Sequence, residues 1–131
     1  CSQAMKNERQ LTGRRGEDEA CRLLESMGQT ILCRNWRYGH LEIDIISLDS
    51  EGLHIVEVKS LTAPAAAAPE AKVDRRKRQK MIAGAKAYLN SESRKGLPTD
   101  LEVFFDVVSV LFDGPDFEIE YYPQAFIPIY D

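Results

Sequence analysis

Residues 41–60 read LEIDIISLDSEGLHIVEVKS. The stretches 41–48 and 53–59 are rich in Ile, Leu and Val, and DSEG at 49–52 has the composition of a turn. This pattern predicts two antiparallel strands joined by a four-residue loop. The loop length in turn predicts which residues of the two strands lie opposite each other.

Two acidic residues are expected to face each other across this hairpin. If Leu48 lies opposite Leu53, counting inward places Asp44 opposite Glu57. Opposed residues have Cβ atoms about 4.5 to 5.5 Å apart, and like charges at that separation destabilise a sheet. A bound cation would remove this objection, and magnesium takes oxygen ligands that include one or two carboxylates. The hairpin therefore predicts a magnesium site.

Lys59 extends the candidate site. Residues two apart in a strand share a face, so Lys59 points the same way as Glu57, toward a phosphate or an attacking water. Hydrolysis of a phosphodiester needs an activated water and stabilisation of the developing charge, which a metal and an ammonium group supply. Spacing alone leaves an alternative open, in which Lys59 pairs with Glu42 or Glu57 and Asp44 caps a turn of a solvated hairpin.

The flanking sequence supplies two helices and three further strands. Apolar spacing predicts helices over 11–27 and 73–91, and composition predicts strands over 30–37, 101–112 and 117–122. The order αβββαββ predicts an α/β fold in a single domain, residues 1–131. Residues 1–10 are expected to form a flexible N-terminus. Residues 61–71, with two prolines among six alanines, are expected to be a flexible connector.

Composition limits the partners of the chain. No apolar stretch approaches the roughly 20 residues of a membrane span, so we expect no membrane partner. The first ten residues lack the apolar core of a secretory signal, which favours a cytoplasmic location. The three cysteines are odd in number and lack C-x-x-C spacing, which argues against a disulfide framework and a structural zinc site.

Positive charge is concentrated in one segment. The net charge of -4 argues weakly against a nucleic-acid partner, but residues 72–80 read KVDRRKRQK. Lys77 lies one helical turn before Met81 on the apolar stripe, so we expect it to lean toward the sheet. The candidate nucleic-acid contacts are Arg14, Arg34, Arg37, Lys72, Arg75, Arg76, Lys77, Arg78 and Lys80. A solvated helix face is the alternative explanation of such a run.

Glu17 and the two histidines are less specific signals. Glu17 lies near the start of the first predicted helix, where an acid interacts favourably with the helix dipole whether or not it binds metal. His54 falls on the opposite face of its strand from Glu57, and His40 is isolated. We expect both histidines to be structural.

Five segments, in order, resemble a known family. They are GRRGEDEACRLLESMG at 13–28, CRNWRYGHLEIDIIS at 33–47, LHIVEVKS at 53–60, KVDRRKRQKMIAGAKAYL at 72–89 and FFDVVSV at 104–110. The chain resembles the YraN-like family of bacterial proteins, which is similar to archaeal Holliday junction resolvases within the PD-(D/E)xK nuclease superfamily. The resemblance implies a restriction-endonuclease-like, three-layer α/β/α core with a central mixed β-sheet, and a dependence on Mg²⁺ or Mn²⁺.

The resemblance also implies roles for individual residues. Asp44 and Glu57 would be metal ligands and Lys59 the catalytic lysine. Glu17, from the first helix, and the backbone carbonyl of Val58 would reach the same metal.

Two further positions match the family pattern, and two depart from it. Lys77 matches a lysine on the following helix. Asp106 matches the acid of an R-F-D strand and is expected to be a structural or hydrogen-bonding acid. Leu41 stands where the family has glycine, which alters how closely a substrate approaches the strand, and Phe104 stands where it has arginine.

Three functions are compatible with these observations. The first is a metal-dependent endonuclease acting on DNA, including branched or damaged DNA. The second is a nucleic-acid-binding or assembly module whose site is retained but inactive or dependent on a partner. The third is a protein-interaction domain that uses the acidic C-terminal hairpin and the aromatic tail. Since a resolvase makes two symmetric cuts, the resemblance also implies a homodimer.

Overall fold

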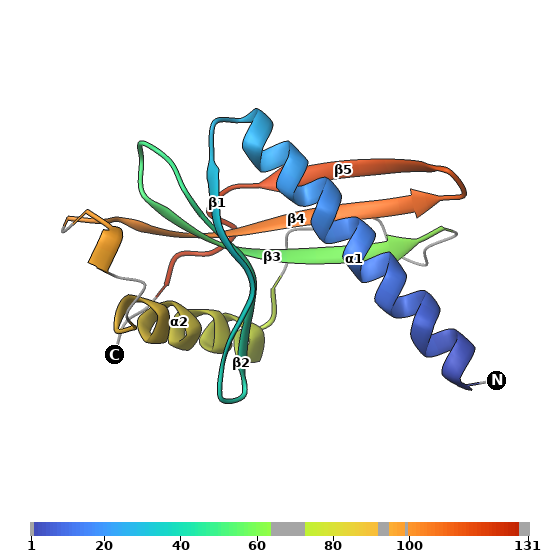
Figure 1. Cartoon of the computed structure of the whole chain (residues 1–131), viewed down its shortest axis with the longest axis horizontal. Coiled ribbons are helices and arrows are strands. Elements are labelled where there is room, and N and C mark those ends of the chain that lie inside the picture. The colour runs from blue at the N-terminus through green and yellow to red at the C-terminus, as the bar shows by residue number, and fades with distance from the viewer. Residues whose placement is uncertain (1, 64–72, 92–94, 99, 129–131) are drawn as a thin grey trace.

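The computed structural model describes residues 2–63, 73–91, 95–98 and 100–128. A five-stranded mixed sheet forms the centre, with one helix on each face (Figure 1). The elements are α1 (Ser2–Ser26), β1 (Thr30–Tyr38), β2 (Leu41–Leu48), β3 (Leu53–Thr62), α2 (Arg75–Leu89), β4 (Val103–Asp113) and β5 (Asp116–Tyr122). The predicted order αβββαββ and the three-layer α/β class are confirmed.

The strands lie in the order in which they occur in the chain. Only β3 and β4 are parallel, and the connection between them contains α2, as a parallel pair requires. The predicted pairs of Leu48 with Leu53 and of Ile46 with Ile55 are present. Gly52 closes the loop with φ +155°, and a Cβ there would lie 2.3 Å from the carbonyl oxygen of Glu102. The hairpin therefore requires glycine at this position.

Two apolar clusters fill the space between the sheet and its helices. On the α2 side, Ile55 and Phe105 of the sheet pack with Met81 and Tyr88. On the α1 side, the sheet packs against Ala20, Cys21 and Leu24. Neighbouring residues of a strand point to opposite faces of the sheet, so each strand can contribute side chains to both clusters. Each fully buried large side chain contributes about 1.5–3 kcal/mol to stability.

Two elements are longer than the sequence predicts by more than one residue. Helix α1 begins at Ser2 instead of residue 11, because residues 2–10 are mostly good helix formers although they carry no apolar stripe. Strand β3 extends to Thr62 because its parallel pairing with β4 continues as far as Phe112. Residues 64–71 of the predicted connector lie outside the described part of the chain, and the flexibility of residues 1–10 remains a prediction.

The composition predicts neither a membrane span nor a disulfide framework. In the described part of the chain, no helix is both long and apolar enough to cross a membrane. Cys21 is buried and Cys33 half-buried, and both thiols are free.

Candidate functional site

Strands β2 and β3 separate at the point where the acidic residues lie. Their ladder ends at the pair Ile45 and Val56, one position before the predicted pair of Asp44 with Glu57. Beyond this point β2 pairs only with β1, and β3 pairs only with β4. The Asp44 Oδ2 atom instead accepts a hydrogen bond from the backbone N–H of Val58 at 2.9 Å. The expected regular pairing is therefore replaced by a fork, in which the carboxylate satisfies a backbone donor of the neighbouring strand.

The β1–β2 hairpin twists at this fork. Ile45 packs in the cluster on the α1 side, whereas Ile43 packs in the cluster on the α2 side. Residues two apart in a regular strand share a face, so the alternation is interrupted at Asp44. Asn35, which lies between the residues paired with Ile45 and Ile43, has φ +52°. The twist places Asp44 at the boundary between the two layers.

The surroundings of Asp44 disfavour the charged form of its carboxyl group. Burial, reinforced by the charges of Glu57 and Glu17, raises its pKa to about 7, although the N–H of Val58 and the charge of Lys77 act in the opposite direction. A carboxyl group in this state titrates near neutral pH. A cation bound beside it would favour the ionised form, so the donors present fit a divalent metal that takes oxygen ligands.

Lys77 reaches the same site from α2. Its Nζ atom lies 3.0 Å from Oε2 of Glu57. Burial lowers the pKa of Lys77, but the hydrogen bond to Glu57 and the neighbouring acids outweigh it, so the pKa is raised overall. Asp74 caps the helix by accepting from the N–H of Lys77 at 2.8 Å. The expectation that Lys77 leans toward the sheet is confirmed.

Glu17 approaches the fork from α1. Gly16 permits a close contact of this helix with β3, because a Cβ at Gly16 would lie 1.8 Å from Oγ of Ser60. Glu17 accepts a hydrogen bond from the side-chain amide of Asn35 at 2.9 Å and lies 3.7 Å from the guanidinium of Arg34. Its charge contributes to the raised pKa of Asp44, so the two carboxylates share one electrostatic environment.

The acids are not assembled into a finished metal cage. Within the described residues, no three His, Cys, Asp or Glu side chains are grouped closely enough to hold a metal ion. Glu57 is engaged by Lys77, and Glu17 by Asn35. Lys59 is half-buried on β3, in register with Ser109 of β4. The predicted metal ligation, including that by the carbonyl of Val58, remains a prediction.

Comparison with known proteins shows the family of the chain. The model of the family described as "Uncharacterised protein family UPF0102" matches residues 16–110, which include every acid at the fork. The chain belongs to the UPF0102 family. A UPF0102 protein of Bacteroides thetaiotaomicron is 37% identical over 116 residues, covering 88% of this chain and 92% of that protein. A UPF0102 protein of Desulforapulum autotrophicum is 41% identical over 122 residues, covering 93% and 98%. The predicted resemblance to YraN-like proteins is confirmed.

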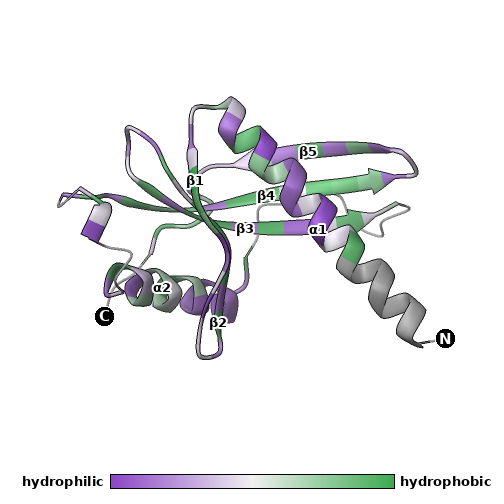
Figure 2. Cartoon of the chain, viewed as in Figure 1, coloured by the Kyte–Doolittle hydropathy of each residue, from purple (hydrophilic) through white to green (hydrophobic). Residues whose placement is uncertain are grey.

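This UPF0102 chain carries its predicted basic residues in three places. The first half of α2 exposes Arg75, Arg76, Arg78 and Lys80, and the hydrophilic colour gathers there in Figure 2. Arg14 is exposed on α1. On β1, Arg34 pairs with Asp18 at 2.8 Å and Arg37 lies 3.5 Å from Glu42. Lys72 lies outside the described residues.

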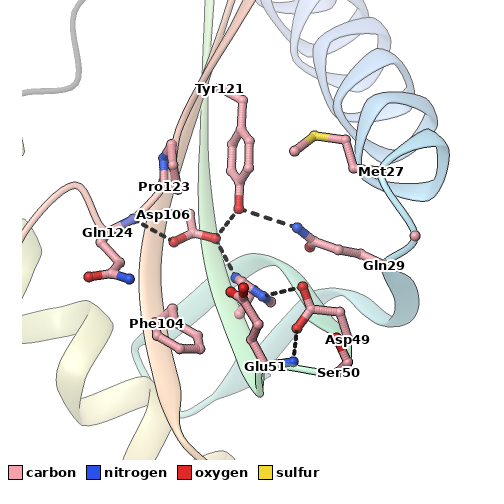
Figure 3. A pocket seen from close by; sticks show the side chains of 12 residues that line it. Met27, Gln29, Asp49, Ser50, Glu51, Phe104, Asp106, Tyr121, Pro123 and Gln124 are labelled. Carbon is pink, nitrogen blue, oxygen red and sulfur yellow. Dashed lines mark hydrogen bonds and ion pairs between the residues drawn. The ribbon is translucent and has the colours of Figure 1, made fainter.

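A second polar cluster was not anticipated from the sequence. We call it the buried cluster; its members are His54, Asp106, Asp49, Tyr121, Gln29 and Ser47. Figure 3 labels Asp106, Asp49, Tyr121 and Gln29 among them. His54 Nδ1 lies 2.6 Å from Asp106 Oδ2 and His54 Nε2 lies 2.9 Å from Asp49 Oδ2. Asp106 also accepts from the hydroxyl of Tyr121 and, at 2.9 Å, from the N–H of Gln124. The cluster borders a cavity of about 520 Å³.

The contacts of His54 favour its charged form. Burial lowers its pKa, but hydrogen bonds to Asp106 and Asp49 outweigh this, and the pKa of His54 is raised. Phe104, which stands where the family has arginine, stacks on the imidazole with ring centroids 5.2 Å apart, an arrangement that favours a protonated ring. The expectation of a hydrogen-bonding role for Asp106 is confirmed. The signal in the sequence was a polar residue inside each of two apolar runs, LHIVEV and FFDVVSV.

Proposed function

We propose that this UPF0102 chain is a metal-dependent endonuclease that hydrolyses phosphodiester bonds of DNA, including branched or damaged DNA. The observation that carries the proposal is the fork between β2 and β3. There Asp44, with its pKa raised to about 7, meets the charge of Glu57 in a half-buried position. Lys77 pairs with Glu57, and Lys59 lies two residues after Glu57 on the same strand. Such a perturbed acid at the edge of the ladder is typical of a functional site and costs stability if it has no ligand.

The residues at the fork suit the parts that phosphodiester hydrolysis requires. Asp44 and Glu57 would hold Mg²⁺ or Mn²⁺, with Glu17 reaching the same ion from α1. When bound, the ion would lower the pKa of a water and stabilise negative charge on the phosphate. Lys59, on the face of β3 that carries Glu57, would orient the phosphate or the attacking water. Lys77 would hold the Glu57 carboxylate in the ion-free protein and is available to a phosphate once the ion takes over that carboxylate.

The basic surface supports a polyanionic substrate. The exposed cations of α2 lie in its first two turns, next to Lys77, whose ammonium group pairs with Glu57 at the fork. Phosphate groups bound along this helix would therefore approach the acids, although the chain as a whole is acidic. A homodimer would supply the second, symmetric cut of a branched substrate.

A second candidate is a nucleic-acid-binding or assembly module without cleavage of its own. The specific observation in its favour is the pairing of Glu57 with Lys77 at 3.0 Å. In this reading Lys77 neutralises Glu57 in the isolated protein, and a metal is admitted only when a partner or substrate displaces the lysine.

Calorimetric titration of magnesium and manganese tests the proposal, together with nicking assays on branched and linear DNA. The double variant Asp44→Asn/Glu57→Gln should lose metal binding and at least about 100-fold of the nicking rate, because both carboxylate charges are gone. The asparagine keeps an oxygen that can accept from the N–H of Val58, so the fold is preserved.

A matched control removes the same charge elsewhere. The double variant Asp113→Asn/Glu118→Gln changes two exposed acids on the β4–β5 hairpin and should behave as the wild type. Metal binding without nicking would favour the binding module. Wild-type nicking by the variant at the fork would refute the assignment of the site.

A further inference from the structure

An aromatic pair lies on the β1–β2 hairpin beyond the fork. Trp36 and Tyr38 stack with ring planes 7° apart and centroids separated by 6.2 Å. Tyr38 is 64% exposed, more than any other aromatic side chain that the structure describes. In Figure 1 the closed end of this hairpin extends beyond the sheet. We call Trp36 and Tyr38 the aromatic platform.

Contacts with α2 hold the aromatic platform in place. Trp36 meets Tyr88 of α2 edge to face, with centroids 5.4 Å apart, and Tyr88 is almost fully buried. Ile43, which pairs with Trp36, packs so closely on Gly84 that a Cβ there would lie 3.0 Å from it. The exposed ring of Tyr38 therefore rests on a partner anchored in the core. Little conformational entropy is lost when another planar ring stacks on it.

The platform is close to the acids of the fork. Asn35, opposite Asp44, precedes Trp36 directly, and Tyr38 follows three residues after Asn35. At about 3.3 Å per strand residue, Tyr38 lies roughly 10 Å along the strand from the fork. A strand of nucleic acid with its phosphate at the fork would have a base within reach of the platform one to three nucleotides away.

Only some bases can use such a surface. Within a duplex both faces of a base are covered by its neighbours, whereas an unpaired or flanking base offers an open face to an aromatic ring. The basic turns of α2, the helix that holds Trp36 through Tyr88, provide positive charge for the adjoining phosphates, and exposed Arg37 adds charge on the opposite face of the hairpin. Aromatic rings combined with cationic groups are typical of proteins that bind single strands.

We propose that the aromatic platform stacks on an unpaired base next to the scissile phosphate, so that the substrate class is DNA with a single-stranded arm or branch point. The inference rests on the proposed function for its substrate, but it concerns binding and does not depend on cleavage. It assigns to Tyr38 the selection of branched over fully paired DNA.

Binding in the presence of EDTA tests this assignment separately from catalysis. Trp36 is the only tryptophan, so its fluorescence reports on the platform directly. Forked DNA with unpaired arms should quench Trp36 and bind more tightly than a fully paired duplex of equal length. Tyr38→Ala should reduce that preference by about 5- to 100-fold, the effect of losing one stacked base. Tyr38→Phe, which keeps the ring, should retain it.

Phe117→Ala is the matched control, because it removes an aromatic side chain that is 40% exposed on β5. It should leave the preference for forked DNA unchanged. The inference is overturned if Tyr38→Ala keeps the wild-type preference, or if the wild type binds neither DNA. It is also overturned if Tyr38→Ala only converts a dimer into a monomer, because the platform would then contact a second copy of the chain. A wild type that binds forked DNA preferentially but does not nick it would instead refute the proposed function and leave this inference standing.

Discussion

Acidic side chains meet two different environments on this sheet. Asp106 in the buried cluster is fully shielded from solvent, and it accepts hydrogen bonds from His54, Tyr121 and the backbone of Gln124. Asp44 at the fork accepts from the N–H of Val58 while facing the negative charge of Glu57. The more deeply buried acid, Asp106, therefore has more hydrogen-bond partners than Asp44 among the described residues.

This difference separates a structural cluster from a candidate functional one. In the buried cluster the imidazole of His54 lies between two carboxylates, and its hydrogen bonds to them raise its pKa. Among the described residues, Asp44 is in no ion pair of this kind, and the Lys77 ammonium pairs with Glu57. A group whose charge is costly in the free protein gains most when a ligand of opposite charge binds. Burial alone would have pointed to the buried cluster and not to the fork.

The largest effect expected from this comparison follows removal of Asp106. Asp106→Ala leaves Nδ1 of buried His54 and the hydroxyl of Tyr121 without their shared partner, which should cost about 3–5 kcal/mol of the free energy of unfolding. Urea denaturation measures this loss. Glu118→Ala, which removes an exposed acid of β5, should change stability by less than about 0.5 kcal/mol. Equal stability of the two variants would contradict a structural role for the buried cluster.

Removal of the acid at the fork is expected to increase stability instead of lowering it. Asp44→Asn should stabilise the metal-free protein at pH 8 by up to about 4 kcal/mol, because the folded pKa of about 7 lies about three units above the ordinary value of 3.8, one pKa unit is worth about 1.4 kcal/mol, and Asn removes the charge. Thermal denaturation with and without magnesium tests this. Magnesium should raise the melting temperature of the wild type and not that of the variant. A destabilised Asp44→Asn would mean that the charge of Asp44 is favourable in the folded protein.

A smaller effect is expected from the pH dependence of the buried cluster. The folded pKa of His54 is raised above its ordinary value of 6.5, so its contribution to stability is fully present below that pH and is lost as pH rises through the folded pKa. Asp44 also makes stability fall as pH rises, since its folded pKa of about 7 exceeds its ordinary value of 3.8. The measurement is therefore made in the Asp44→Asn background, by urea denaturation between pH 5.5 and 9.

In that background a remaining fall in stability toward alkaline pH is assigned to His54. The further change His54→Gln should flatten the profile over this range. A profile that keeps its slope after this substitution would show that another group carries the proton.

The smallest effect on stability is expected on the basic surface outside both clusters. Arg76→Ala on α2 removes an exposed charge and should change the free energy of unfolding by less than about 0.5 kcal/mol. It should nevertheless reduce the slope of log K against log salt for DNA binding by about 0.9 if the guanidinium contacts a phosphate of duplex DNA. Fluorescence titrations at several salt concentrations measure the slope, and an unchanged slope would remove Arg76 from the interface.

Local sequence patterns determined most of the architecture. The turn composition of residues 49–52 and the apolar runs beside them define the β2–β3 hairpin, and apolar spacing defines the core of both helices. The same hairpin register brought Asp44 near Glu57, and the stripe through Met81 turned Lys77 toward the sheet. These features depend on contacts close in sequence, which periodicity and turn chemistry report directly.

Only the tertiary structure decided how the polar groups are paired. His54 and Asp106 are 52 residues apart and meet because β3 and β4 are parallel neighbours. The fork arises because β2 and β3 choose different partners beyond Val56, and Asp44 then bonds to the backbone of Val58. Such choices depend on the competition among all strands for hydrogen bonds and on burial from both layers. A linear pattern identifies the residues that carry charge, but the field that each of them experiences is created by residues distant in sequence.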